Sequence, residues 1–334
     1  MKKTGKVFMI VILISLGVFG GIYLSGISAT AAAPIEIRFG HVGFPNSLFD
    51  ITANEYAKRV NAALKGKVEV QTFHSSQLGT DEAMLKAIRV GGIEMFLPST
   101  IMSTTEAKFG AFEMPYLIVN RAHMKKVSED PKVKETLFSP MPAKGMRLLG
   151  YWENGFRHAT NNVRPIAKPE DLKGIKLRVP AGVWRVKMFR AYGASPTPLA
   201  FAEVYSALQS GVMDGQENPL AQIWGAKFQE VQKYLSFTGH VYTPAYPAIS
   251  EDLWKKLPKD VQQTLEKIAV EVGDVARAEG ARLDKELADK MAARMTLNEV
   301  DKDAFIRASA PIYHEFDVEV PGGADLVKHI QSLR

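Results

Sequence analysis

Apolar and polar positions along the first part of the chain follow two periods. IEIRFGHV at 35–42 and KVEVQTF at 67–73 alternate with a period of two, which predicts strands. LFDITANEYAKRVNAAL at 48–64 has apolar residues at helical spacing, and DEAMLKAIRVGG at 81–92 begins with acids and ends with glycines, as helices do. IEMFLP at 93–98 predicts a third strand. Strand, helix, strand, helix, strand predicts a parallel sheet covered by helices, which makes this lobe α/β.

The same pattern starts again further along the chain. GFRHATN at 155–161 and GIKLRVP at 174–180 predict short strands. GVWRVKMFRAYG at 182–193 and PLAFAEVYSALQSG at 198–211 predict helices that end in glycine. A second α/β lobe follows from this repetition of strands and helices.

Residues 257–295 have apolar positions at helical spacing and only one proline, near the start. They predict one long or gently broken helix that can brace two lobes. No stretch rich in Pro, Gly and Ser marks a linker, so we expect the lobes to exchange strands. We predict lobe I from residues 34–155 and about 243–282, and lobe II from residues 156–242 and about 283–334.

The first residues are predicted to be an export signal. MKKTGK is basic, VFMIVILISLGVFGGIYL is apolar, and SGISATAAAP ends in small residues suited to cleavage after Ala31 or Ala33. An uncleaved membrane anchor is the alternative, because about 18 apolar residues begin to span a bilayer. Residues 1–33 are therefore predicted to be a signal peptide, and the bacterial periplasm is the expected location.

Composition narrows the chemistry. The chain has no cysteine, which excludes a lipid-modified cysteine and a disulfide framework. The formal charge of +6 includes the leader's three lysines, and the mild charge that remains argues against nucleic-acid binding. The seven histidines never occur at i and i+4, and there is no nucleophile elbow or P-loop, so we expect no metal site, no cofactor and no catalytic residue.

Three polar residues stand at or near strand ends of the second lobe: Arg157, Arg178 and Asn218. Ligands of α/β sheets gather at the carboxyl ends of strands. Two guanidinium groups that converge would repel each other unless an anion lies between them, and a carboxylate matches the guanidinium fork. Alternation in GIKLRVP leaves another interpretation open, in which Lys176 and Arg178 face water.

Three long segments resemble a known family: 155–180, 193–219 and 228–250. They include GFRHATN, KLRVP and DGQENP, and the likeness extends more loosely over 73–95 and the leader. The chain resembles the periplasmic solute-binding proteins of tripartite ATP-independent periplasmic (TRAP) transporters, the DctP family. The resemblance implies a fold of two α/β lobes joined by crossing strands, with a long C-terminal helix spanning both lobes.

The resemblance also implies roles for single residues. It assigns the main salt bridge with a ligand carboxylate to Arg178, a partner arginine to Arg157, an amide contact to Asn218 and an aromatic contact to Phe201. Trp152, by default a core aromatic, is included as a further candidate. In the first lobe the candidate contacts, which would select the acid, are His41, Phe44, Asn46 and Ser99.

The implied function is binding without chemistry. A monomeric receptor would take a small organic acid, such as a dicarboxylate, a sugar acid, a 2-oxo acid or an aromatic acid, to a permease of one small and one large membrane subunit. An ion gradient would drive transport. One alternative is a secreted lyase or isomerase in which Glu153 and His158 flank Arg157 as acid and base. Another is a binding protein that reports to a sensor kinase or chemoreceptor.

Overall fold

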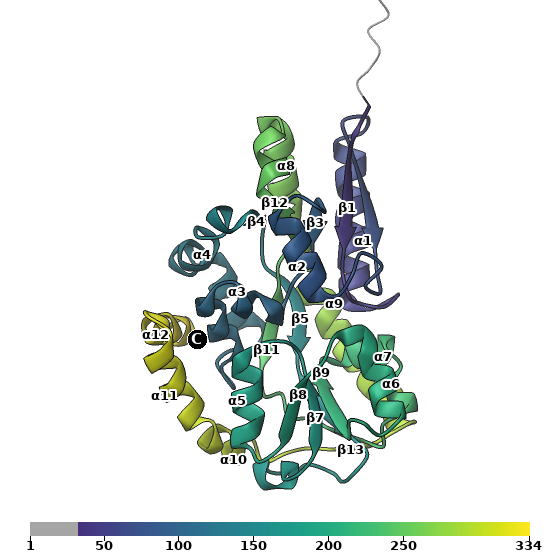
Figure 1. Ribbon diagram of the computed structural model, residues 1–334, viewed down its shortest axis with the longest axis vertical. Helices are drawn as coiled ribbons and strands as arrows, with labels where there is room; N and C mark the ends of the chain where they lie inside the picture. The colour runs from purple at the N-terminus through teal and green to yellow at the C-terminus, as the bar shows by residue number, and fades with distance from the viewer. Residues whose placement is uncertain (1–32) are drawn as a thin grey trace, which may run out of the picture. The chain divides into compact units, whose positions relative to one another are not determined.

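The computed structural model describes residues 33–334 (Figure 1). The predicted signal peptide therefore lies outside the described residues, apart from Ala33. Among residues 33–334, no helix is both long and apolar enough to cross a bilayer.

The first sheet has five strands in the order β2-β1-β3-β12-β4. Strand β1 is parallel to β2 and β3, whereas β12 is antiparallel to both β3 and β4. The three strands predicted at 35–42, 67–73 and 93–98 are parallel, as predicted, whereas the antiparallel strands β12 and β4 that extend this sheet are not predicted from the sequence. The strands are β1 (Ile35–Gly40), β2 (Val68–Phe73), β3 (Met95–Phe96), β4 (Met146–Leu148) and β12 (Ala248–Ser250).

Helices α1 (Leu48–Ala63) and α2 (Asp81–Arg89) connect the first three strands, as their periodicity predicts. Ser47 and Thr80 cap these helices, and their side chains accept hydrogen bonds from Asp50 N and Ala83 N at 3.4 and 3.3 Å. The Thr80 cap fixes the start of α2, so Asp81 and Glu82 form its first turn.

The second sheet has six strands in the order β13-β10-β6-β9-β7-β8. Strand β7 is parallel to β8 and β9, and β6 is antiparallel to β9 and β10. The strands are β6 (His158–Asn161), β7 (Lys176–Val179), β8 (Ser195–Pro198), β9 (Gly215–Asn218), β10 (Tyr234–Ser236) and β13 (Thr296–Asn298). The helices of this part include α5 (Val183–Ala191), α6 (Val204–Gln209) and α7 (Leu220–Gly225).

A pair of antiparallel strands, β5 (Trp152–Phe156) and β11 (Tyr242–Ala245), lies between the two sheets (Figure 1). The predicted strand at 155–161 is in fact divided, because the chain passes from β5 into β6 at Arg157. This crossing pair confirms the expectation of two α/β lobes that exchange strands.

Helix α9 (Lys259–Ala292) is 34 residues long and confirms the predicted long helix. It packs against α1 of the first lobe, against the crossing strand β5 and against α7 of the second lobe. Gly273 lets it approach closely, since a Cβ there would lie 2.6 Å from the carbonyl oxygen of Tyr151.

The remaining helices surround this framework. Helix α11 packs on α5, whereas α12 packs on Ala107–Glu113, a segment that the predicted boundaries assign to the other lobe. The exact lobe boundaries stay a prediction. These helices are α3 (Arg121–Glu129), α4 (Pro131–Phe138), α8 (Glu251–Lys256), α10 (Lys302–Ala308), α11 (Ala310–Glu319) and α12 (Gly323–Ser332).

Candidate ligand-binding cleft

A cavity lies where loops of the first lobe meet strand ends of the second. The space between its lining side chains, including its mouth, is about 520 Å³. The centre of a water-sized sphere can occupy about 40 Å³ of this space, so the cavity is narrow. The lining residues that bear on the chemistry are Asp81, Glu82, Ser99, Thr100, Asn154, Arg157, Arg178, Phe201, Asn218 and Gln222.

Arg178 projects from β7 and is only 3% exposed, whereas Lys176 on the same strand is exposed. The alternative in which Arg178 faces water is therefore wrong. Its Nε and Nη2 donate to the carbonyl oxygen of Leu199 at 2.8 and 2.6 Å, and its guanidinium carbon lies 5.8 Å from the ring centroid of Phe201.

No carboxylate in the described part of the chain lies within 4.0 Å of the Arg178 guanidinium nitrogens. Burial lowers the pKa of Arg178 to about 10, and the group stays a cation at neutral pH. An uncompensated cation inside a protein is costly, so an anion from outside the chain would be strongly stabilised here.

Arg157 is also buried, but an internal carboxylate holds it. Its Nε and Nη2 donate to the two carboxylate oxygens of Glu217 at 2.6 and 2.9 Å, and Nη2 also donates to Asn218 Oδ1 at 3.0 Å. The expectation of a ligand anion between the two arginines needs correction for Arg157, because Glu217 already supplies an anion.

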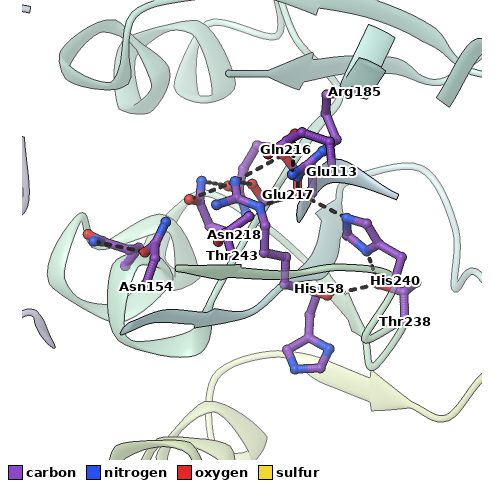
Figure 2. A network of polar contacts seen from close by, with 12 residues as sticks. Glu113, Asn154, His158, Arg185, Gln216, Glu217, Asn218, Thr238, His240 and Thr243 are labelled. Carbon is purple, nitrogen blue, oxygen red and sulfur yellow. Dashed lines mark hydrogen bonds and ion pairs between the residues drawn. The ribbon is translucent and has the colours of Figure 1, made fainter. Parts of the chain in front are cut away.

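Glu217 is the centre of a buried network (Figure 2). Arg185 Nη1 donates to Glu217 Oε2 at 2.5 Å, and Arg185 Nη2 donates to Glu113 Oε2 at 2.7 Å. Burial opposes ionisation of Glu217, but Arg157 and Arg185 outweigh it and hold the pKa of this carboxyl well below its ordinary value. Two guanidinium groups are thus balanced by two carboxylates.

His240 completes the network as a neutral ring. Burial lowers the pKa of His240 to about 4. Its Nε2 lies 3.0 Å from Glu217 Oε2 and its Nδ1 lies 2.8 Å from Thr238 Oγ1 (Figure 2). A carboxylate can only accept, so Nε2 carries the proton and Nδ1 accepts from the threonine hydroxyl.

Neutral polar groups line the rest of the cavity. Asn218 Nδ2 donates to Gln216 Oε1 at 2.6 Å, and Ser99 Oγ donates to the carbonyl oxygen of Pro244 at 2.7 Å. Within residues 33–334, Thr100 Oγ1 and Gln222 Oε1 are buried without a hydrogen-bond partner. Free hydrogen-bonding capacity therefore faces the cavity.

Four sequence candidates do not line this cavity: His41, Phe44, Asn46 and Trp152. His41 is fully buried, and Asn46 is exposed with a left-handed φ of 65°. Phe44 packs against Phe201, with ring centroids 5.8 Å apart.

Trp152 belongs to the core of the first lobe. Its indole Nε1 donates to the carbonyl oxygen of Ala269 at 2.8 Å, and its ring lies against Phe39 and Tyr56. The candidate contact at Trp152 is therefore corrected to a packing role, and Arg157, Arg178, Phe201, Asn218 and Ser99 are the predicted residues that the cavity brings together.

The two residues of the enzyme alternative are also elsewhere. Glu153 accepts hydrogen bonds from Arg121 Nη2 at 2.6 Å and from the Tyr242 hydroxyl at 2.9 Å. His158 lines a separate crevice with Tyr116 and Lys302, and burial lowers its pKa to about 3. They do not flank a common ligand site.

Several residues of the site are not predicted from the sequence. Glu217 stands beside Asn218 in QENP, and Arg185 is one of three basic residues of α5, so the sequence does not distinguish it from the exposed Arg190. Asp81 and Glu82 fit a helix start so well that the sequence gives no reason to expect them in a cavity. The residues of the site that the sequence does not indicate also include Thr100, Glu113, Asn154, Gln222 and His240.

Two α/β lobes with crossing strands and a polar cavity between them define a protein that binds a small ligand between its lobes. Comparisons with known proteins identify the family. Residues 39–319 match the bacterial extracellular solute-binding proteins, family 7 (DctP). The chain belongs to this family, and its relatives are TRAP solute-binding proteins.

The 2,3-diketo-L-gulonate-binding periplasmic protein YiaO of Escherichia coli is 33% identical over 315 residues, which are 93% of this chain and 96% of that protein. The sugar acid binding protein DctPAm of Advenella mimigardefordensis, solved with galactonate, has a TM-score of 0.86 and 30% identity, covering 90% of this chain and 98% of the other. A TRAP solute-binding protein of Sulfurospirillum deleyianum with bound succinate has a TM-score of 0.85 and 34% identity, covering 90% and 100%.

Proposed function

We propose that this protein binds a small organic acid in the cavity, with the ligand carboxylate on Arg178, and delivers it to a TRAP permease. The observation that carries the proposal is the state of Arg178, a buried cation that lines the cavity with no carboxylate paired to it among the described residues. Relatives and solved neighbours that bind gulonate derivatives, galactonate or succinate support it.

Arg157 and Asn218 act beside Arg178. Glu217 holds the Arg157 guanidinium in place, and Arg157 in turn fixes the amide of Asn218. Groups that are fixed before the ligand arrives lose little conformational entropy on binding. The two residues therefore present a rigid polar wall to the carboxylate.

Binding draws contacts from both lobes. Ser99 and Thr100 come from the first lobe, and Arg178 and Phe201 come from the second. A ligand that contacts both lobes favours the closed arrangement, and closure excludes water and strengthens the ionic contacts.

Membership of the DctP family supports delivery of the bound acid to a TRAP permease. The leader would direct export to the periplasm, and the loaded monomer would dock on the small and large membrane subunits of the permease. Opening of the lobes there would release the acid unchanged, so the protein is proposed to act without catalysis.

Arg178→Lys tests the proposal. Lysine keeps the charge but loses the forked contact, so binding of the acid measured by isothermal titration should weaken about 100-fold. Arg190→Lys is the matched control, because Arg190 is exposed on α5 of the same lobe, and it should bind like wild type. Wild-type affinity in a folded Arg178→Lys variant would overturn the proposal.

A further inference from the structure

The charged residues of the cavity limit the charge of the ligand. The charged side chains that line it are Asp81, Glu82, Arg157 and Arg178. Glu217 pairs with Arg157 at 2.6 Å, so Arg178 is the lining cation that stays available. The cavity therefore offers one cation to a ligand, and a second anionic group on that ligand would have none.

Asp81 and Glu82 belong to the first turn of α2 in the first lobe, and they line the cavity together with Arg178 of the second lobe. Their negative charges partly offset the effect of burial on the pKa of Arg178. Neither carboxylate lies within 4.0 Å of the Arg178 guanidinium nitrogens. A ligand held by Arg178 in this cavity would therefore also lie near the two carboxylates.

The unpaired polar groups indicate what the second end of the ligand carries. Gln222 is 3% exposed and Thr100 is 8% exposed, and their Oε1 and Oγ1 have no partner among residues 33–334. Gln222 Oε1 and the carboxylates accept hydrogen bonds, so they need donors. Because these acceptors come from separate elements, α2 and α7, several hydroxyl groups along one chain satisfy them better than a single ammonium group.

The titration of Asp81 agrees with this geometry. Burial and the neighbouring charge of Glu82 raise the pKa of Asp81 to about 7. A further carboxylate beside this pair would add like charge in a desolvated space, which is unfavourable.

We propose that the ligand is a polyhydroxylated monocarboxylic acid, and that Asp81 and Glu82 make the cavity reject four-carbon dicarboxylates. This inference rests on the proposed function, since it needs the carboxylate on Arg178. It adds the substrate class and the residues that select it.

Titration of the full mature protein with three kinds of acid tests the inference. The polyhydroxy acids are D-gluconate, L-gulonate and D-galactonate, the dicarboxylate is succinate, and 4-aminobutanoate carries an ammonium in place of one succinate carboxylate. The best polyhydroxy acid should bind at least about 100-fold tighter than succinate and 4-aminobutanoate.

Tightest binding of succinate or of 4-aminobutanoate, with that binding lost in Arg178→Lys, would overturn this inference and leave the proposed function standing. If none of the five acids binds, this inference fails. The proposed function fails as well only if a wider panel with 2-oxo acids and aromatic acids also gives no binding.

Glu82→Gln gives a second readout. Removal of this charge should raise the affinity for succinate relative to the polyhydroxy acid at least about tenfold. Glu36→Gln is the matched control, because Glu36 is exposed on β1 and should leave the ratio unchanged. An unchanged ratio in a folded Glu82→Gln variant would contradict the selecting role of Glu82.

Discussion

The buried arginines of the site differ in how their charges are satisfied. Arg157 and Arg185 share Glu217, and Arg185 also pairs with Glu113. Arg178 donates to one carbonyl oxygen, and no carboxylate of residues 33–334 pairs with it. Breaking a buried pair costs several kcal/mol, so the paired arginines stabilise the lobe, while Arg178 retains its attraction for an anion from outside.

His240 gives the network a pH dependence. Its folded pKa of about 4 is below the ordinary value of 6.5, so below about pH 6.5 the unfolded chain takes up a proton that the folded ring refuses. Stability from this residue is therefore present above pH 6.5 and falls as pH drops toward 4.

The contribution of His240 to the free energy of unfolding should fall by about 2 kcal/mol between pH 7 and pH 5. Urea unfolding measures this free energy at both pH values. The decrease from pH 7 to pH 5 should be smaller for His240→Asn than for wild type. His314→Asn, at an exposed position on α11, should lose as much as wild type. An equal loss in all three proteins would show that His240 does not titrate in this way.

At the scale of elements, α9 approaches the crossing strand β5 and the residue before it closely. Gly273 faces the carbonyl oxygen of Tyr151, and Gly280 faces the buried Glu153 carboxylate. Glycine inside a helix is normally less favourable than alanine by about 1 kcal/mol. Glycine occupies these two positions because a Cβ atom would come too close to the neighbouring atoms.

Gly273→Ala should therefore destabilise the protein by about 1–3 kcal/mol despite the better helix propensity, because the new methyl group meets backbone that cannot rotate away. Chemical denaturation measures the change. Val270→Ala, at a position 52% exposed on the same helix, should change stability by less than about 0.5 kcal/mol. A gain in stability for Gly273→Ala would mean that α9 does not pack this tightly.

The spacing of apolar residues along the sequence predicts most of these helices and strands. It does not predict which strands pair with each other. The helices α1, α2 and α9 follow from apolar spacing and capping residues such as Ser47. The antiparallel return of β12 and the break at Arg157 depend on contacts between distant segments, so periodicity does not reveal them.

The site shows the same division. Family resemblance and strand-end position identify Arg178 and Asn218 as candidates, and both line the cavity. Alternation along a strand does not show whether a polar side chain faces water or a cavity. Only the fold shows that Lys176 is exposed and Arg178 is buried. The pairing of Arg157 with Glu217 joins residues 60 positions apart and has no local signal.

At the scale of the whole molecule, the cavity exists only where the two lobes meet. The first lobe contributes Asp81, Glu82 and Thr100, and the second contributes Arg178 and Gln222. The α9 helix and the pair β5 and β11 connect the two halves of the site, and we expect the lobes to close by hinge motion about these connections. We therefore expect ligand binding and lobe closure to occur as one process.

The most direct test of the role of Arg178 is a crystal structure of the mature protein with its bound acid. We expect the ligand carboxylate to accept hydrogen bonds from the Arg178 guanidinium at about 2.7–2.9 Å, with Arg157 still paired to Glu217. A carboxylate bound away from Arg178, or an Arg178 that pairs with a carboxylate of the protein in the complex, would contradict the central claim.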